Sequence, residues 1–332
     1  MRTTTTTTTD KLPILIGALV LLLVAAVAGV SVGTRTVAPA EIWRAFTAFA
    51  GTDDHLVIRD LRLPRTLLGL VIGAALGVAG ALVQTMTRNP LAEPGLLGVT
   101  AGAGFAINLG VLFGLADSPA MQLVLSVAGC AAAAILVYAV GRSSPLRLVL
   151  AGVALSAVLS GVSLGMRLIW PDVLDEYRFW SVGALAGVTG SSQTLPTVVL
   201  LLALAGSLVV ARPLGVVTLG EDTAQALGAH VARTRTAVLI LVTVLAGAAT
   251  AIAGPIAFVG LMIPHLARRF AGGSTPWLIG FSLVFGPVLL VLADVMSRVL
   301  LPTGEVPVAI VTAFIGAPVL IWAVRRYGAR SL

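Results

Sequence analysis

The sequence predicts an all-α integral membrane protein with about ten transmembrane helices. Of its 332 residues, 58% are hydrophobic and 11% are charged, and the mean hydropathy is +1.04. A water-soluble protein of this length cannot bury so large an apolar share. The apolar runs are long and continuous, which favours helices over the alternating strands of a barrel. The 36 glycines indicate helices that pack closely through small residues.

Ten apolar segments, each bounded by charge, proline or glycine, are the candidate spans. The eighth is too short to cross as an ordinary helix, and it contains Pro264. Such a segment is tolerated at membrane depth only where protein or a water-filled path surrounds it, so we expect it inside the bundle. The segments cover residues 12–32, 63–85, 96–115, 121–140, 146–169, 195–210, 236–254, 255–267, 277–300 and 306–324.

These spans form one expected domain, residues 12–326, between a disordered N-terminal tail, residues 1–11, and a C-terminal tail, residues 327–332. The N-terminal tail contains seven consecutive threonines, a polar run of low complexity. The first apolar segment is longer than the apolar region of a cleaved signal peptide, so we expect it to remain as a span.

Positive charge gives the expected orientation of the ten spans, whose even number places both termini on one side. With the termini in the cytoplasm, thirteen of the 21 Lys and Arg residues lie on the inner side and eight on the outer side. This bias favours cytoplasmic termini. Three of the outer arginines fall within residues 59–65, against the usual trend.

Several functions are excluded by missing residues. The only lysine is Lys11, so the chain has no phosphate-binding Gly-x-x-x-x-Gly-Lys-Ser/Thr loop, and any ATP hydrolysis must come from another chain. A single cysteine, Cys130, cannot form an internal disulfide or a cysteine metal site. The three histidines have no metal-ligand spacing, and the spans hold no paired carboxylates or Ser/His set of an intramembrane enzyme. We expect no catalytic residue, metal or cofactor in this chain, and no nucleic-acid partner.

Residues 89–98 read Asn-Pro-Leu-Ala-Glu-Pro-Gly-Leu-Leu-Gly and follow the second span. Two prolines and two glycines in ten residues cannot form an uninterrupted helix. The sequence therefore predicts a shaped inner loop, longer than an ordinary helix–helix connection needs.

The loop of residues 212–235 is the longest on the predicted inner side. Glu221 and Asp222 suit the N-terminus of a helix, and Gly228 is placed to end it. The sequence predicts a short surface helix here, which by itself could be a solvated loop helix without a special role.

Arginines cluster at the predicted outer face. Arg62 and Arg65 lie where the outer loop meets the second span, and Arg298 lies at the outer end of the ninth. Arginine binds carboxylates through two parallel hydrogen bonds, so Arg59, Arg62, Arg65 and Arg298 could hold acidic residues of another protein. The alternatives are interfacial snorkelling or internal pairing with Asp60 or, for Arg298, with Asp294.

The 89–98 motif resembles the signature of FecCD-like permease subunits of type II ATP-binding-cassette (ABC) importers, which carry iron-siderophores, haem or vitamin B12. The resemblance covers nearly the whole chain. The other similar motifs are Arg-Leu-Pro-Arg at 62–65, Phe-Trp-Ser-Val-Gly at 179–183, Ile-Pro-His at 263–265, Ala-Asp at 293–294 and Gly-Ala-Pro at 316–318.

This resemblance implies the ten-helix fold of the vitamin B12 permease and three kinds of partner besides the lipid bilayer. These are a second permease subunit, identical or paralogous, two ATPase subunits that bind ATP and Mg²⁺, and an extracytoplasmic binding protein. The implied ATPase-coupling residues are Gly220, Glu221, Asp222, Ala224, Leu227 and Gly228. Binding-protein docking would fall to Arg59, Arg62, Arg65 and Arg298, and a cytoplasmic gate to Asn89, Pro90, Ser143, Ser144 and Pro145. For Ser143 and Ser144, an ordinary helix cap is an equal alternative.

We therefore expect a multi-pass permease of a prokaryotic cell membrane that imports a ferric siderophore by ATP-driven alternating access. Haem and cobalamin are alternative substrates. The alternative from another class is a transporter driven by an ion gradient, for which Asp294 is nearly the only ionisable candidate within the spans.

Overall fold

The computed structural model describes residues 8–33, 37–141, 145–188, 192–301 and 304–327. Their regular structure is helical apart from one isolated β-bridge between Leu301 and Gly304. The helices are α1 (Thr8–Ser31), α2 (Pro39–Thr47), α3 (Asp53–Leu56), the π-helical turn η1 (Val57–Arg62), α4 (Leu63–Thr87), the 3₁₀ turn η2 (Pro94–Leu97), α5 (Val99–Leu112), α6 (Pro119–Gly141), α7 (Pro145–Ile169), α8 (Pro171–Trp180), α9 (Thr194–Val217), α10 (Glu221–Ala226), α11 (Val231–Ala253), α12 (Val259–Ala271), α13 (Thr275–Val299) and α14 (Val308–Tyr327).

A helix lies over each of the ten predicted segments. Seven described helices are long and apolar enough to cross a membrane: α1, α4 with the turns before it, α6, α7, α9, α11 and α13. The other three, α5, α12 and α14, are shorter. The first helix begins at Thr8, so residues 8–11, expected in a disordered tail, are helical. Residues 1–7 of that tail lie outside the described residues, as does most of the expected C-terminal tail.

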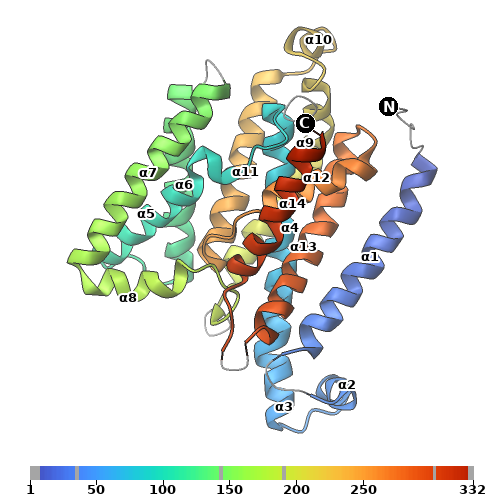
Figure 1. The fold of residues 1–332 in the computed structure, drawn as a ribbon, viewed down its shortest axis with the longest axis vertical. Coiled ribbons are helices and arrows are strands. Elements are labelled where there is room, and N and C mark those ends of the chain that lie inside the picture. Colours follow the sequence, from blue (N-terminus) through green and yellow to red (C-terminus); the bar gives the residue numbers. More distant parts are fainter. Residues whose placement is uncertain (1–7, 34–36, 142–144, 189–191, 302–303, 328–332) are drawn as a thin grey trace.

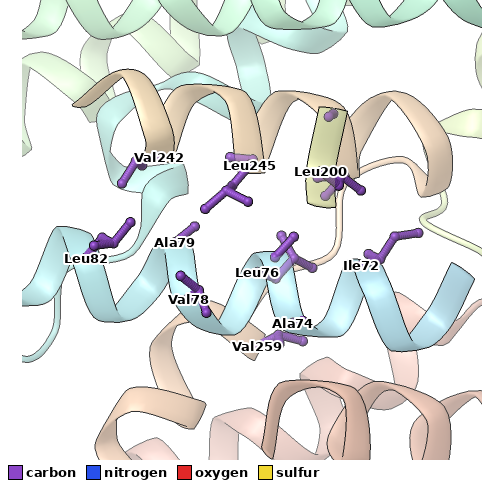
Figure 2. Packing of buried hydrophobic residues seen from close by; sticks show 14 of the residues in the cluster. Ile72, Ala74, Leu76, Val78, Ala79, Leu82, Leu200, Val242, Leu245 and Val259 are labelled. Atoms are coloured by element: carbon purple, nitrogen blue, oxygen red, sulfur yellow. The ribbon is translucent and has the colours of Figure 1, made fainter. Parts of the chain in front are cut away.

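Helix α4 is the centre of the bundle. It packs against α9, α11, α12 and α13, and most of its side chains are buried. Figure 2 shows Leu82 of α4 facing Val242 of α11, and Leu76 and Ala79 of α4 facing Leu245, within the main hydrophobic core. A Cβ atom built on Gly73 would lie 2.6 Å from the Gly286 carbonyl oxygen of α13. The helices therefore meet backbone to backbone, as small residues allow in membranes.

The helix bundle has two ends, and different short helices lie at each (Figure 1). Helix α10, the start of α1 and the end of α14 lie at one end, which we call the α10 end. Helices α2, α3 and α8 lie at the other, which we call the α2 end. Helices α5 to α8 form a group on one side of α4, and α1 lies on the opposite side, against α13.

Two connections break the helical run next to α4. The first joins α4 to α5 and starts at Arg88, whose φ of 51° is left-handed. The second joins α11 to α12 through residues 254–258 and ends at Phe258, with φ 69°. Helix α12 then starts at Val259, which is fully buried. Most of residues 259–267 are buried, so the expectation that this short segment lies inside the bundle is confirmed for its helical part, while residues 255–258 are more exposed.

Candidate functional site

The connection after α4 is the shaped loop that the two prolines predict. The Asn89 side-chain oxygen accepts a hydrogen bond from the Leu91 backbone N–H at 3.0 Å, and the Ala92 N–H donates to the Asn89 carbonyl at 3.0 Å. The asparagine side chain thus closes a local turn. Pro90 is buried, and it lines two separate cavities.

Glu93 ties this loop to the second break. Its Oε1 accepts a hydrogen bond from the Phe258 backbone N–H at 2.9 Å. The bond joins residues that are 165 positions apart, one in the connection after α4 and the other just before α12. Among the described residues, no basic group forms an ion pair with Glu93. The sequence analysis did not single out Glu93, although a carboxylate within an apolar, proline-bounded loop was an available signal.

The Phe-Trp-Ser-Val-Gly motif packs against the second break. The Trp180 indole N–H donates to the Thr250 carbonyl at 2.9 Å, and the Ala184 N–H donates to the Ala253 carbonyl at 2.9 Å. Gly254 has φ 71°, and a side chain there would collide with the Trp180 carbonyl. The Ala184 N–H therefore pairs a carbonyl of the last turn of α11, and Trp180 adds a second donor to the Thr250 carbonyl, which also accepts from the Gly254 N–H at 2.9 Å.

A cavity of about 210 Å³ lies beside the Asn89 loop, between α4, α6, α7 and α11. Asn89 and Glu93 line it, together with Tyr138 of α6 and Arg235 of α11. Two of the expected gate residues, Ser143 and Ser144, lie outside the described residues. Pro145 is the first residue of α7. The structure thus places Asn89 at a space between helices.

Helix α10 projects from the bundle between α9 and α11 (Figure 1). Glu221 and Asp222 occupy its first turn, Gly220 precedes it with φ 118°, and Gly228 follows it with φ 79°. The predicted surface helix and its ends are confirmed. Glu221 Oε1 forms an ion pair with the Arg235 side chain at 2.6 Å, which ties α10 to α11.

The apolar side chains of α10 and of the turns next to it differ in exposure. Ala224 is fully buried against Val217 and Val231, so it holds the helix in place and cannot contact another protein. The expected ATPase-coupling role of Ala224 stays a prediction, and its burial limits that role to positioning α10. Leu227 and Leu219 are 64% and 62% exposed. Exposed leucines beside exposed Asp222 form a small apolar and acidic surface at the tip of the α10 end.

Three of the four arginines expected to dock a binding protein have internal partners. Arg65 and Arg298 both bind Asp294, with the Arg65 Nη2 at 2.7 Å and the Arg298 Nε at 3.0 Å from its oxygens. Arg65 also pairs with Glu305 at 2.7 Å. Arg62 donates to the Ser31 carbonyl at 2.7 Å.

Two of these side chains are almost completely buried. Arg62 is 5% exposed and Arg298 is 2% exposed, and Arg298 also donates to the Gly29 carbonyl at 2.7 Å. In this conformation Arg62 and Arg298 join the end of α1 to α4 and α13, and the docking role expected for them stays a prediction. The internal pairing of Arg298 with Asp294 is confirmed. Arg59 is partly exposed and lies over the Phe49 ring at 4.6 Å.

The described residues contain no group of three or more His, Cys, Asp or Glu side chains that could hold a metal ion. The arrangement instead has the parts of a membrane permease: apolar spans, a central helix flanked by two broken segments, and a protruding helix at one end. These features define the class as a multi-pass transport protein.

The family comparison makes the assignment specific. The model of the FecCD transport family matches residues 21–326, and the chain belongs to that family. It is 48% identical over 318 residues to the ferric enterobactin transport system permease protein FepD of Escherichia coli (strain K12), covering 93% of this chain and 94% of the relative. It is 37% identical over 327 residues to the probable siderophore transport system permease protein YfiZ of Bacillus subtilis (strain 168), covering 96% and 97%.

A solved structure of a metal-chelate type ABC transporter in an inward-facing conformation has the same fold. The TM-score is 0.80 at 29% identity, covering 95% of this chain and 99% of that chain. The protein is thus an ABC importer permease and not itself an enzyme. This assignment excludes the ion-gradient alternative, and Asp294 fits the exclusion because two arginines bind it.

Proposed function

We propose that the chain forms the membrane pathway of a prokaryotic ABC importer that carries a ferric siderophore. The observation that carries this proposal is the 48% identity to a ferric enterobactin permease along 94% of its length. The cavity beside Asn89 is lined mainly by apolar side chains, and its charged residues are Glu93 and Arg235. Haem and cobalamin are the alternative cargoes.

In this proposal the α10 end faces the cytoplasm and receives the ATPase. Glu221 is held by Arg235, and Ala224 is buried, so the contact surface consists of Asp222, Leu219 and Leu227. Gly220 and Gly228 set the path of the chain around α10. Two ATPase subunits would bind ATP and Mg²⁺ and move α10 as they close. Because α10 is tied to α9 and α11, its movement would pass directly to helices that contact α4.

The α2 end then faces outward and receives a binding protein loaded with the chelate. Arg59 is the remaining arginine of the expected docking set that is not fastened to α1 or Asp294. A second permease subunit, identical or paralogous, would complete the pathway between the two chains.

The test is the ATPase activity of the chain purified with its ATPase in lipid nanodiscs, with and without the binding protein. We expect the binding protein to stimulate hydrolysis. Leu227→Ser combined with Asp222→Ala should remove the stimulation and weaken ATPase retention. Gln225→Ala is the matched control, since Gln225 is an exposed residue of the same helix and should behave as wild type.

Substrate is tested in the same assembly reconstituted in liposomes. ATP-dependent uptake of radiolabelled iron as ferric enterobactin should exceed uptake of haem or cobalamin. If no ATPase associates with the wild-type chain, the coupling proposal fails. If haem or cobalamin enters and the siderophore does not, the cargo is wrong while the importer class stands.

A further inference from the structure

A basic pocket lies at the α10 end, apart from the cavity beside Asn89. Its volume is about 380 Å³, and it is formed by the ends of α4, α9 and α12 and the beginning of α13. Its polar lining includes Arg88 and Arg268, together with Gln84, Ser274 and Thr275. None of the proposed functional roles above uses these side chains.

The two arginines of this pocket have only neutral partners. The Arg88 Nη2 donates to the Val217 carbonyl at 2.7 Å, and the Arg268 Nη2 donates to the Gln84 side-chain oxygen at 3.0 Å. Within the described part of the chain, no carboxylate forms an ion pair with either arginine, and none lines the pocket. Each guanidinium carries five N–H donors, so most donors remain for a ligand.

Gln84 fixes the position of the Arg268 side chain. Gln84 is 1% exposed, and its amide nitrogen donates to the Gly260 and Leu261 carbonyls at 3.3 and 3.2 Å. These bonds fix the amide so that its oxygen faces Arg268. The buried Gln84 side chain thus holds the half-buried Arg268 at the pocket wall. Arg268 therefore loses less conformational entropy on ligand binding than a freely rotating surface arginine would.

The start of α13 adds positive potential to the same pocket. This 25-residue helix has no acidic residue in its first turn, and the Ser274 side chain makes no capping hydrogen bond. The N-terminus of a helix carries unpaired N–H groups and a partial positive charge that favour anions. The two arginines and this helix N-terminus therefore supply positive potential where the pocket lining contributes no negative charge.

We propose that this pocket binds a phosphate-bearing anion. Arginine, hydroxyl donors and a helix N-terminus together match the charge and hydrogen-bonding of phosphate. Two sources offer that chemistry at the end of a membrane bundle: the headgroup of an anionic phospholipid, or a soluble phosphate compound. Because Arg88 also bonds the Val217 carbonyl, the ligand would connect α4 and α12 to the segment that leads into α10.

The test uses the full-length chain in nanodiscs and follows its thermal unfolding midpoint. One arm adds inorganic phosphate to phosphatidylcholine discs, with chloride at equal ionic strength as the reference. The other arm replaces part of the phosphatidylcholine with phosphatidylglycerol, without phosphate in solution. We expect at least one arm to raise the midpoint by about 2–4 °C at saturation. The arm that responds identifies the source.

Two variants and a control decide whether the response belongs to this pocket. Arg88→Gln combined with Arg268→Gln should abolish the shift. Ser274→Asp should also abolish it while keeping the Arg268–Gln84 bond, because it places a carboxylate beside the arginines and caps α13. Arg212→Gln, an exposed arginine on α9, should keep the wild-type response.

The proposal is overturned if neither arm shifts the wild-type midpoint, or if the Ser274→Asp protein shifts as wild type does. It is also overturned if phosphate has no effect but the double variant releases the ATPase, since an acidic side chain of the ATPase would then be the occupant. These outcomes are independent of the cargo, because no substrate enters the measurement.

Discussion

Arginines at the two ends of the bundle are held in different ways. At the α2 end, Arg65 and Arg298 share Asp294, and Arg298 is almost completely buried. At the α10 end, Arg88 and Arg268 bind only neutral oxygens and face an open pocket. The buried, paired arginines at the α2 end hold neighbouring helices together. The arginines at the α10 end have no counter-ion among the described residues and can bind an anion. Removing the carboxylate at the α2 end should therefore lower the free energy of unfolding strongly. Removing an arginine at the α10 end should change it little.

The largest effect is expected for Asp294→Asn. The substitution leaves Arg65 and Arg298 without their shared carboxylate, and an unpaired buried charge costs about 3–5 kcal/mol. The thermal midpoint in detergent should fall sharply, with loss of folded protein. Asp172→Asn, at an exposed position on α8, is the control and should leave the midpoint unchanged. If Asp294→Asn unfolds at the wild-type midpoint, the ion pairs of Asp294 with Arg65 and Arg298 do not stabilise the fold.

A smaller loss is expected for Glu93→Ala, which removes a half-buried carboxylate that bonds one backbone N–H. The Phe258 N–H would be left unpaired inside the bundle, at a cost of about 1–3 kcal/mol. Glu93→Gln keeps an acceptor oxygen and should recover most of the stability. Denaturant titration of both variants measures the difference. Equal losses in the two variants would show that the charge itself, and not the hydrogen bond, is required.

Glu305→Gln should have a minor effect at the same end as Asp294. Glu305 pairs with Arg65, but its side chain is 31% exposed, and exposed ion pairs contribute less than about 1 kcal/mol. The thermal midpoint should fall slightly, and high salt should remove the difference from wild type. A loss as large as that of Asp294→Asn would place Glu305 among the fastening groups.

The smallest effect on stability is expected for Arg88→Gln. Arg88 is exposed, and its single bond to the Val217 carbonyl can be replaced by water, so the change should stay within about 0.5 kcal/mol. Unfolding in phosphate-free phosphatidylcholine nanodiscs measures it. A marked loss there would assign Arg88 a structural role and remove the contrast between the two ends.

Local sequence signals predicted much of this molecule, and long-range contacts account for the rest. The helix positions, the turn at Asn89 and the limits of α10 follow from apolar length, proline, glycine and helix-end charge. The Arg298–Asp294 pair was visible as an alternative because the residues are four apart on one helix. The Arg65–Asp294 contact joins residues 229 apart, and the Glu93–Phe258 contact joins residues 165 apart. Neither has a local signature, because both depend on which helices become neighbours of α4.

The burial of individual side chains could not be predicted from local sequence patterns either. Ala224 and Leu227 are three positions apart on α10, yet one is fully buried and the other is 64% exposed. Only the positions of α9 and α11 decide which face of so short a helix is covered. The burial of Arg62 and Arg298 was hidden for the same reason, since both bind carbonyl groups at the end of α1.

The backbone contact between Gly73 of α4 and Gly286 of α13 limits how this protein can diverge. Each glycine lies against the other's carbonyl oxygen, so a methyl group on either one would strike the opposite helix. Changing both residues at once would add a second clash and relieve neither. No single or paired substitution opens a route away from glycine at this seam. In a library of random variants, these two positions should therefore be among the first to lose all diversity under selection for transport.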